Sequence, residues 1–321
     1  MSLVAYSAGR ARPLPPGLVL VAAVLAISWA GPLIRFATAP ALAVSVWRLV
    51  LSVAFIALVL AFRRGALVGV GTLLWGRGGV LALLAGLFLA AHFWSWIASL
   101  SLTTVASSVV LVNTQAIFVG LLSVLFLGER PRLWQWVGIL VAVAGAMLVG
   151  WGDFALGRDA LVGDLLAVAG AVFASCYYVI GRRLRRELDL WAYVGVVYGV
   201  AALALTVAVV GHPGVTMTGY PPGDWAIFLA LAAGPMMIGH TGVNYALRYI
   251  PAYVANVAVL GEPIGATLIA WLLPGLREVP PLQTLVGGVV ILIGIALTVL
   301  AGRERRPAGS PTRIIAEGGH S

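Results

Sequence analysis

Apolar residues form long, nearly uninterrupted blocks along this chain instead of amphipathic stripes. Each block is about 20 residues long, which is the length that crosses a hydrocarbon core at about 1.5 Å of rise per residue. Continuous blocks of this length are typical of transmembrane helices and not of a soluble core. The pattern predicts ten helices, at residues 17–36, 41–62, 79–101, 104–126, 133–151, 162–181, 190–211, 225–247, 252–274 and 282–301.

The connections between the predicted helices are mostly very short, as at Ser101–Thr103 and Arg248–Pro251. Short connections force consecutive helices to lie antiparallel and adjacent, and they leave no room for a separate soluble domain. We therefore predict an all-α integral membrane protein with a tail at 1–16. A second tail at 302–321, rich in Arg, Pro and Gly, is predicted to be disordered.

Composition supports the same class and excludes several others. Apolar residues make up 61% of the chain and charged residues only 10%, whereas charged residues near a quarter are usual in soluble proteins. The single cysteine, Cys176, excludes a disulfide framework and a cysteine metal site. All twenty basic residues are arginine, so a P-loop lysine and a pyridoxal Schiff base are excluded. We predict no cofactor and no bound metal.

Arginine placement predicts the orientation of the chain, because cytoplasmic loops of membrane proteins carry an excess of positive charge. With both termini inside, sixteen arginines fall on the cytoplasmic side and three on the outer side, namely Arg35, Arg158 and Arg277. This bias predicts a plasma-membrane protein with both termini in the cytoplasm. Binding to nucleic acid is not predicted, because no basic face interleaved with aromatic residues lies outside the spans.

The two halves of the chain resemble each other. His92, in the segment Ala91–Trp96, matches His240, in the segment Gly239–Asn244, 148 residues later. Because each half has an odd number of predicted helices, the second half enters the membrane from the opposite side, which gives inverted repeats. The predicted repeats are 17–151 and 162–301, joined by a loop at 152–161. Further matches pair Glu129, Pro131, Leu133, Gly138 and Gly145 with Glu278, Pro280, Leu282, Gly287 and Gly294.

These features together resemble the drug/metabolite transporter superfamily, and specifically its ten-helix EamA type, over about residues 17 to 301. The resemblance implies a basket of helices around a central cavity, with helices five and ten peripheral, and transport of amino acids or other small metabolites. One departure is Thr114-Gln115-Ala116, which stands where many relatives place a proline. The resemblance is carried by Ser28-Trp29, Trp47-Arg48, Ala91-His92-Phe93, Ser99-Leu100, Thr104-Val105-Ala106-Ser107-Ser108, Gly128-Glu129-Arg130-Pro131 and Glu262-Pro263.

Glu262 is the acidic residue that the sequence places deepest in the membrane. It lies about ten residues into the predicted helix 252–274, or roughly 15 Å along it, near the bilayer middle. Ionisable groups at that depth are costly and usually functional, so Glu262 is a candidate proton acceptor or cation partner. The alternative is a protonated side chain bonded to a neighbouring backbone group. Pro263 frees a backbone carbonyl that could line the site.

Three basic residues are further candidates. The inverted repeat brings His92 and His240 toward the middle, where imidazoles could bind substrate or relay protons. The alternative is that each is a packed histidine bonded to a hydroxyl group. Arg48 lies about seven residues inside the helix 41–62 and is predicted to contact a substrate carboxylate or polar groups at an outer gate. Its alternative is snorkelling to the interface.

Aromatic and amide side chains within the spans could complete a concave site, which needs apolar walls and a few directed polar groups. Each of them could equally be packing. The full predicted substrate-binding set is Trp29, His92, Trp96, Asn113, Gln115, Tyr178, His240, Asn244 and Glu262.

The sequence predicts a monomeric secondary transporter in a lipid bilayer, not an enzyme. It would export a small polar metabolite by alternating access, with amino acids the class implied by the resemblance and Glu262 the coupling group if protons are used. One alternative is exchange of hydrophobic cations for protons. A second is an intramembrane enzyme, for which no nucleophile and base are visible at one depth. A third is a membrane scaffold that transports nothing.

Overall fold

A computed structural model describes residues 14–63, 66–76, 78–103, 105–150, 157–212, 214–274 and 282–303. Most of the two predicted tails lies outside these residues, as does the first half of the predicted loop 152–161. Glu278 and Pro280 of the sequence repeat also lie outside them. Within the described residues every regular element is a helix.

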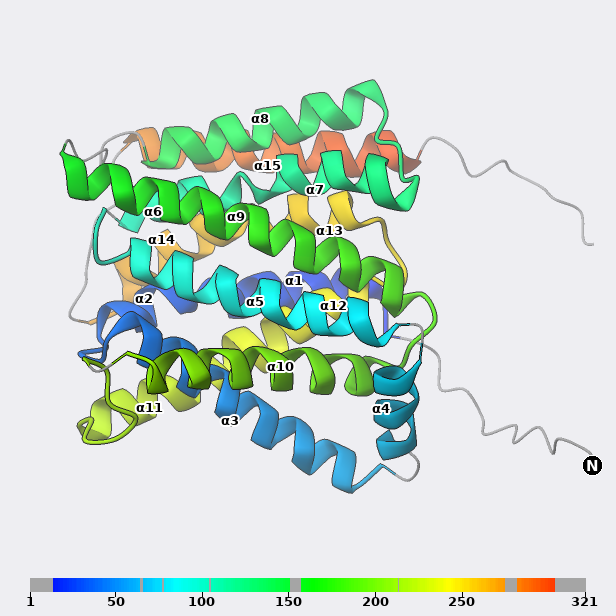
Figure 1. The fold of residues 1–321 in the computed structure, drawn as a ribbon. Coiled ribbons are helices and arrows are strands. Elements are labelled where there is room, and N and C mark those ends of the chain that lie inside the picture. Colours follow the sequence, from blue (N-terminus) through cyan, green and yellow to red (C-terminus); the bar gives the residue numbers. More distant parts are fainter. Residues whose placement is uncertain are drawn as a thin grey trace, which may run out of the picture.

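The helices of the first half alternate between long elements and interrupted ones (Figure 1). They are α1 (Pro16–Ile27), α2 (Ala30–Arg35), α3 (Ala41–Ala61), α4 (Ala66–Trp75), α5 (Gly79–Ser99), α6 (Val105–Asn113), α7 (Gln115–Leu122), the π-helix η1 (Ser123–Leu127) and α8 (Leu133–Gly150).

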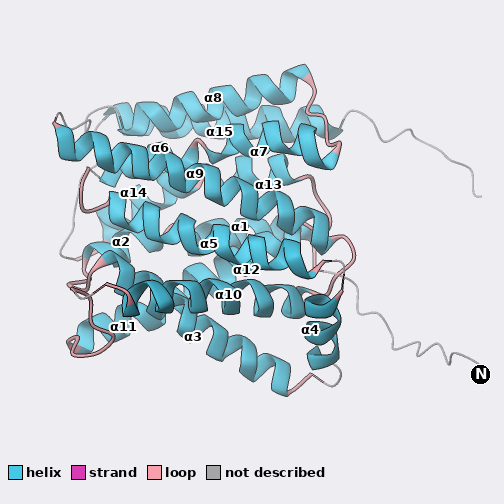
Figure 2. Cartoon of the chain, viewed as in Figure 1, coloured by secondary structure: helices cyan, strands magenta, loops and turns pink. Residues whose placement is uncertain are grey.

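The second half has the same character, and its connections at 186–189 and 247–251 are short (Figure 2). It comprises α9 (Arg158–Arg185), α10 (Leu190–Val210), α11 (Pro222–Leu231), the π-helix η3 (Ala232–His240), α12 (Thr241–Ala246), α13 (Ala252–Val259), α14 (Glu262–Leu272) and α15 (Leu282–Arg303).

Eight of the helical segments in the described part of the chain are long and apolar enough to cross a membrane. Two shorter apolar helices, Leu111–Leu127 and Leu133–Leu148, correspond to the predicted helices 104–126 and 133–151. The protein is therefore an all-helical, multi-pass membrane protein. The eight segments are Pro16–Arg35, Ala41–Ala61, Gly79–Ser99, Arg158–Arg185, Leu190–Val210, Pro222–Ala246, Ala252–Ile269 and Leu285–Gly302.

Two elements differ from the pattern of apolar blocks. Helix α9 runs from Arg158 to Arg185, whereas the apolar block predicts only 162–181. The extra turn at its end persists because Arg182 and Arg185 are buried against protein partners instead of lying in a loop. The short helix α4 lies in the Gly-rich connection after α3, and it runs across the ends of the longer helices (Figure 1).

Large apolar side chains cover the outer surface, and the mostly apolar interior holds a smaller number of buried polar ones. Leu18 is 69% exposed and Leu25 is 60% exposed on α1, while Arg48 on α3 is fully buried. Large apolar residues facing outward are solvated by lipid tails, and buried polar residues facing inward meet one another. The polar groups that could bind a ligand therefore lie in the interior of the protein.

Helices α8 and α15 pack against each other along one edge of the molecule (Figure 1). A Cβ atom on Gly294 would lie 2.4 Å from the backbone nitrogen of Ala142, and one on Gly138 would lie 2.3 Å from Thr298 Oγ1. Such contacts require glycine, because they bring the two backbones closer than side chains allow. This pair is the peripheral pair that the resemblance implies.

Four helices are interrupted where they reach the centre of the molecule. Breaks occur at Ser28–Trp29, at Thr114 and at Leu260–Gly261, and the π-helix η3 ends at His240. The hydroxyl groups of Ser28 and Thr114 bond to preceding carbonyls, at 2.8 Å to Val24 and 2.6 Å to Leu111, and such bonds bend helices. Thr114 thus breaks its helix without a proline. Interrupted helices of this kind are common at binding sites in transporters.

Candidate functional site

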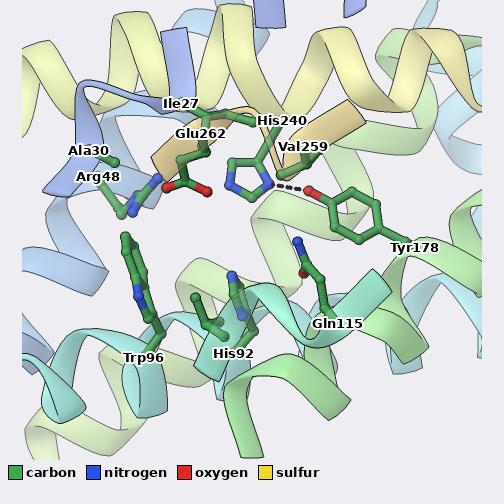
Figure 3. A pocket seen from close by; sticks show the side chains of 11 residues that line it. Ile27, Ala30, Arg48, His92, Trp96, Gln115, Tyr178, His240, Val259 and Glu262 are labelled. Carbon is green, nitrogen blue, oxygen red and sulfur yellow. Dashed lines mark hydrogen bonds between the residues drawn. The ribbon is translucent and has the colours of Figure 1, made fainter. Parts of the chain in front are cut away.

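A small cavity lies where the interrupted helices meet (Figure 3). Its volume is about 30 Å³, which has room for a water molecule or two. A metabolite therefore requires the walls to move apart. The cavity is lined by Ile27, Ala30, Arg48, His92, Trp96, Val112, Gln115, Tyr178, His240, Val259 and Glu262.

The helix breaks position much of this lining. Ile27 and Ala30 flank the break between α1 and α2, and Gln115 is the first residue after the break at Thr114. Glu262 is the first residue of α14, directly after the break at Leu260–Gly261. Because Pro263 has no N–H, the carbonyl of Val259, also in the lining, loses its usual helical donor.

Arg48 is the buried cation of the cavity. Its side chain is 0% exposed, and its guanidinium carbon lies 4.0 Å from the centroid of the Phe93 ring. The Nε and Nη1 atoms have no hydrogen-bond partner among the described residues. No carboxylate of those residues lies within 4.0 Å of it either. Two N–H groups of a buried cation are thus unengaged, which is costly unless a ligand receives them.

Glu262 is the buried acid of the same cavity, and its residue is 8% exposed. Ser28 Oγ donates a hydrogen bond to the backbone carbonyl of Glu262 at 3.4 Å, and not to its carboxylate. No described side chain donates a hydrogen bond to the carboxylate. Figure 3 shows the carboxylate facing the Arg48 guanidinium across the upper part of the cavity. Arg48 and Glu262 therefore line one cavity without forming a salt bridge with each other.

The two histidines of the repeat meet at this cavity. The centroids of the His92 and His240 rings lie 6.4 Å apart. His92 Nδ1 lies 2.9 Å from the carbonyl oxygen of Gly170. Because a carbonyl only accepts, Nδ1 carries the proton and Nε2 is left as an acceptor in the neutral ring. His240 Nδ1 lies 3.2 Å from the hydroxyl of Tyr178, as the dashed line in Figure 3 shows.

Aromatic and amide groups complete the walls. The Trp96 ring is nearly parallel to that of His92, at 3° and 6.2 Å between centroids, and its Nε1 has no partner among the described residues. The backbone carbonyl of Gln115 accepts a hydrogen bond from Ser175 Oγ at 3.1 Å, which holds α7 against α9. The walls therefore present flat apolar faces with a few free polar atoms, as small-molecule sites do.

Three members of the predicted set lie outside the cavity. Trp29 is 42% exposed at the break after α1, so it faces away from the interior. Asn113 is buried, but its amide donates to the carbonyl of Val109 at 2.8 Å. Asn244 lies one turn beyond His240, where its amide donates to the His240 carbonyl at 2.8 Å and to the hydroxyl of Tyr177.

Arg48 lies in the wall of the central cavity, whereas the sequence suggested an outer gate for it. The ring of Phe93 supplies a face for the guanidinium, and Glu262 supplies a nearby opposite charge. The sequence pattern also did not single out Phe93 or the apolar lining residues Ile27 and Val112. The position of Phe93 beside His92 was the available signal. Within the part of the chain that the structure describes, no three His, Cys, Asp or Glu residues cluster to hold a metal ion.

Comparison with known proteins agrees with this architecture. The profile of the EamA-like transporter family matches residues 16–151 and again residues 161–300. The uncharacterized transporter YdfC of Bacillus subtilis is 28% identical over 217 residues, which cover 66% of this chain and 69% of that protein. The UDP-N-acetylglucosamine transporter of Rattus norvegicus is 22% identical over 212 residues, covering 60% of this chain and 61% of that protein.

A solved crystal structure has the same fold. Its TM-score is 0.72 at 21% sequence identity, and the superposition covers 90% of this chain and 97% of that one. At this identity the likeness concerns the fold alone. The family profile accounts for nearly all of the apolar part of the chain, and its members are transporters that act on small molecules across a bilayer. The chain therefore belongs to the EamA-like transporter family.

Proposed function

We propose that this protein is a secondary transporter that exports a small polar metabolite, with amino acids as its substrate class. One observation carries the proposal: Arg48 and Glu262 line the same cavity, and neither charged group makes a hydrogen bond with a described side chain. An amino acid carries a carboxylate and an ammonium group. These groups complement the guanidinium and the carboxylate, and they would satisfy both buried charges at once.

The transport mechanism in this proposal is alternating access. Lining residues come from both segments that match the family profile, with Arg48 and His92 in the first and His240 and Glu262 in the second. A substrate held by both segments can be exposed by rocking one against the other. The helix breaks beside the cavity supply positions where backbone angles can change. Glu262 is the proposed coupling group if protons drive the cycle.

The topology in this proposal has ten crossings in two inverted repeats, 17–151 and 162–301, with 152–161 between them. Both termini are placed in the cytoplasm and the protein in the plasma membrane, because of the arginine bias. We propose a monomer, because two repeats already enclose a complete cavity. Of the predicted site residues outside the cavity, Asn113 and Asn244 act in this proposal through conformations in which the walls have moved apart, and the exposed Trp29 has no binding role in it.

Exchange of hydrophobic cations for protons is the second candidate. The aromatic rings of Trp96 and Tyr178 and the acid of Glu262 favour it. Arg48 opposes it, because a buried guanidinium repels a cationic ligand and leaves its own N–H groups unpaired. The relative that transports UDP-N-acetylglucosamine adds an anionic nucleotide sugar to the substrates to be tested.

The test is counterflow in liposomes that contain the purified protein. Labelled amino acids, UDP-N-acetylglucosamine and a quaternary ammonium dye are offered in parallel, each with and without a proton gradient. We expect amino acids to exchange, and Glu262→Gln to remove any effect of the proton gradient. Trp29→Ala, at an exposed side chain outside the cavity, serves as the matched control. Transport of the dye but not of amino acids would overturn the proposal in favour of cation exchange.

A further inference from the structure

The interface between α9 and α12 holds several polar contacts beyond the cavity, toward the end of the helices. We call it the α9–α12 seam and define it by Tyr177, Gly181 and Arg185 on α9 and by Asn244 and Leu247 at the end of α12. Asn244 donates to the hydroxyl of Tyr177, and the Nε of Arg185 donates to the Asn244 carbonyl at 3.2 Å. The seam begins one turn beyond His240 of the cavity wall.

The seam contains polar atoms that the closed structure does not satisfy. Tyr193 Oη and Asn244 Oδ1 are buried and have no hydrogen-bond partner among the described residues. Both lie beside Gly181, where a Cβ atom would be 2.9 Å from Tyr193 Oη and 3.3 Å from Asn244 Oδ1. Buried polar atoms left in this way destabilise the contact, because water would satisfy them if the helices parted.

The seam contrasts with the permanent contact between α8 and α15. There, Gly138 and Gly294 bring backbones together without leaving space for a side chain. That contact is the kind by which membrane helices associate stably, through close packing of small residues. A polar, imperfectly satisfied interface beside a cavity is suited to separating and becoming hydrated.

The carboxylate of Glu129 holds together the end of the seam that lies away from the cavity. Glu129 Oε1 accepts hydrogen bonds from Arg182 Nε at 2.6 Å and from Arg186 Nη2 at 2.7 Å. Its Oε2 accepts from the backbone N–H of Ala252 at 3.0 Å, at the start of α13. Arg182 in turn donates through Nη1 to the carbonyl of Leu247 at 2.5 Å. Glu129 thus ties the chain after η1 to the end of α9 and to the turn between α12 and α13.

The fastened end lies on the face where α1 begins and α15 ends (Figure 1). Tyr245 Oη, next to Asn244, donates to the carbonyl of Leu14 at 2.9 Å. Arg132, close to Glu129, donates to the carbonyl of Ala301 at 3.2 Å. Leu14 and Ala301, near the two ends of the described chain, therefore lie on the same face of the molecule as Glu129.

We propose that the α9–α12 seam is the closed half of the transport pathway and that Glu129 is the latch that keeps it closed. The inference rests on the proposed function, because a pathway needs a transported substrate. When Glu129 releases Arg182 and the backbone N–H of Ala252, the tie between the end of α9 and the start of α13 is lost, and the seam opens from the cavity to the face where α1 begins. Glu129 acts as a positioning residue, since it does not touch the cavity.

The test measures access of water-soluble reagents to the seam and does not require a known substrate. Leu247 is fully buried and its side chain lies at Gly181, so Leu247→Cys reports on the seam while its backbone carbonyl stays in place. The native Cys176 is first replaced by serine. In this background we expect the introduced cysteine to react slowly with a hydrophilic methanethiosulfonate, and its rate to rise at least about tenfold when Glu129→Gln is added.

Controls separate opening from unfolding. Asp224→Asn weakens the bonds of Asp224 with Thr38, which lie at the opposite ends of the helices, and should leave the reaction rate of the introduced cysteine unchanged. If Glu129→Gln does not fold, the double variant Glu129→Gln with Arg182→Gln also removes the buried cation with which Glu129 pairs and should show the same rise. A folded variant of either kind that reacts at the parent rate would overturn the latch. A faster rate in a protein that transports none of the offered solutes would uphold the seam and sink the proposed function instead.

Discussion

Replacing Arg48 by glutamine tests the chemical group that the cavity recognises. The guanidinium offers two buried N–H groups, on Nε and Nη1, that no described residue receives. A substrate carboxylate can bind the guanidinium as a fork, through Nε with Nη2 or through Nη1 with Nη2, and either fork engages one of these groups. Arg48→Gln removes the charge and this geometry together. We therefore expect it to weaken binding of any ligand that carries a carboxylate.

The size of this loss of affinity follows from the burial of Arg48 with the substrate carboxylate that it binds. Removing one partner of a buried, hydrogen-bonded charge pair costs about 2–5 kcal/mol. Taking about 3 kcal/mol, the dissociation constant for the amino acid should rise about 140-fold. Arg48→Lys keeps the charge but not the planar fork, so we expect a smaller loss of about tenfold. Both variants keep the ring of Phe93 in place beneath the side chain.

The assay compares three ligands on the purified protein by calorimetry. They are the amino acid that binds best, its amide, and the acid that lacks the amino group. The parent should bind the amino acid more tightly than the amide, and Arg48→Gln should bind the two almost equally. Trp29→Ala should retain the parent preference, because Trp29 lies outside the cavity.

One outcome would refute the assignment of Arg48. If folded Arg48→Gln still prefers the amino acid to its amide by the parent ratio, the carboxylate binds elsewhere. If the variant instead gains affinity for quaternary ammonium ligands, charge repulsion by Arg48 alone keeps such cations out of the parent cavity. That second result would also support the cation-exchange alternative once Arg48 is removed.

The remaining predictions concern packing, coupling and the paired histidines. Gly294→Val should lower the free energy of unfolding by about 1–3 kcal/mol or more, because its Cβ would lie 2.4 Å from the Ala142 nitrogen; Gly199→Ala, where a Cβ meets nothing within 4 Å, is the control in detergent unfolding. Glu262→Gln should make counterflow independent of pH if Glu262 carries the coupled proton, and an unchanged pH profile would exclude that role. His92→Phe loses the bond to the Gly170 carbonyl and should lower substrate affinity about tenfold in the calorimetric assay, whereas unchanged affinity would make His92 a packing residue.

Much of the fold could be predicted from the sequence, because lipid imposes simple rules on length and polarity. Blocks of about 20 apolar residues predict spans, and eight of the predicted helices are long apolar spans in the structure. The motifs of the first four predicted helices, of the segment Gly128–Pro131 after them and of Glu262-Pro263 were enough to indicate the family, which the profile confirms. The glycines Gly138 and Gly294, which the sequence matched between the two halves, lie in the close contact of α8 with α15.

The site was harder to predict, and the reason differs among residues. Polar residues in a span stand out, so Glu262, His92 and His240 could be named from the sequence alone. Their common cavity depends on where helices break, and the break at Thr114 has no proline to announce it. Trp29 resembled a wall residue in the sequence, yet the turn after Ile27 directs it outward.

The sequence by itself determined that lipid surrounds the protein, where its spans approximately lie, and which few polar groups must find partners inside. Only the tertiary structure decided which apolar side chains line the cavity, that Arg48 lies over Phe93, and that Glu129 joins three segments far apart in the chain. The physical reason is that lipid and protein interior are both apolar. An apolar side chain is stable facing either, so the hydrophobic pattern of a membrane helix does not reveal which face turns inward.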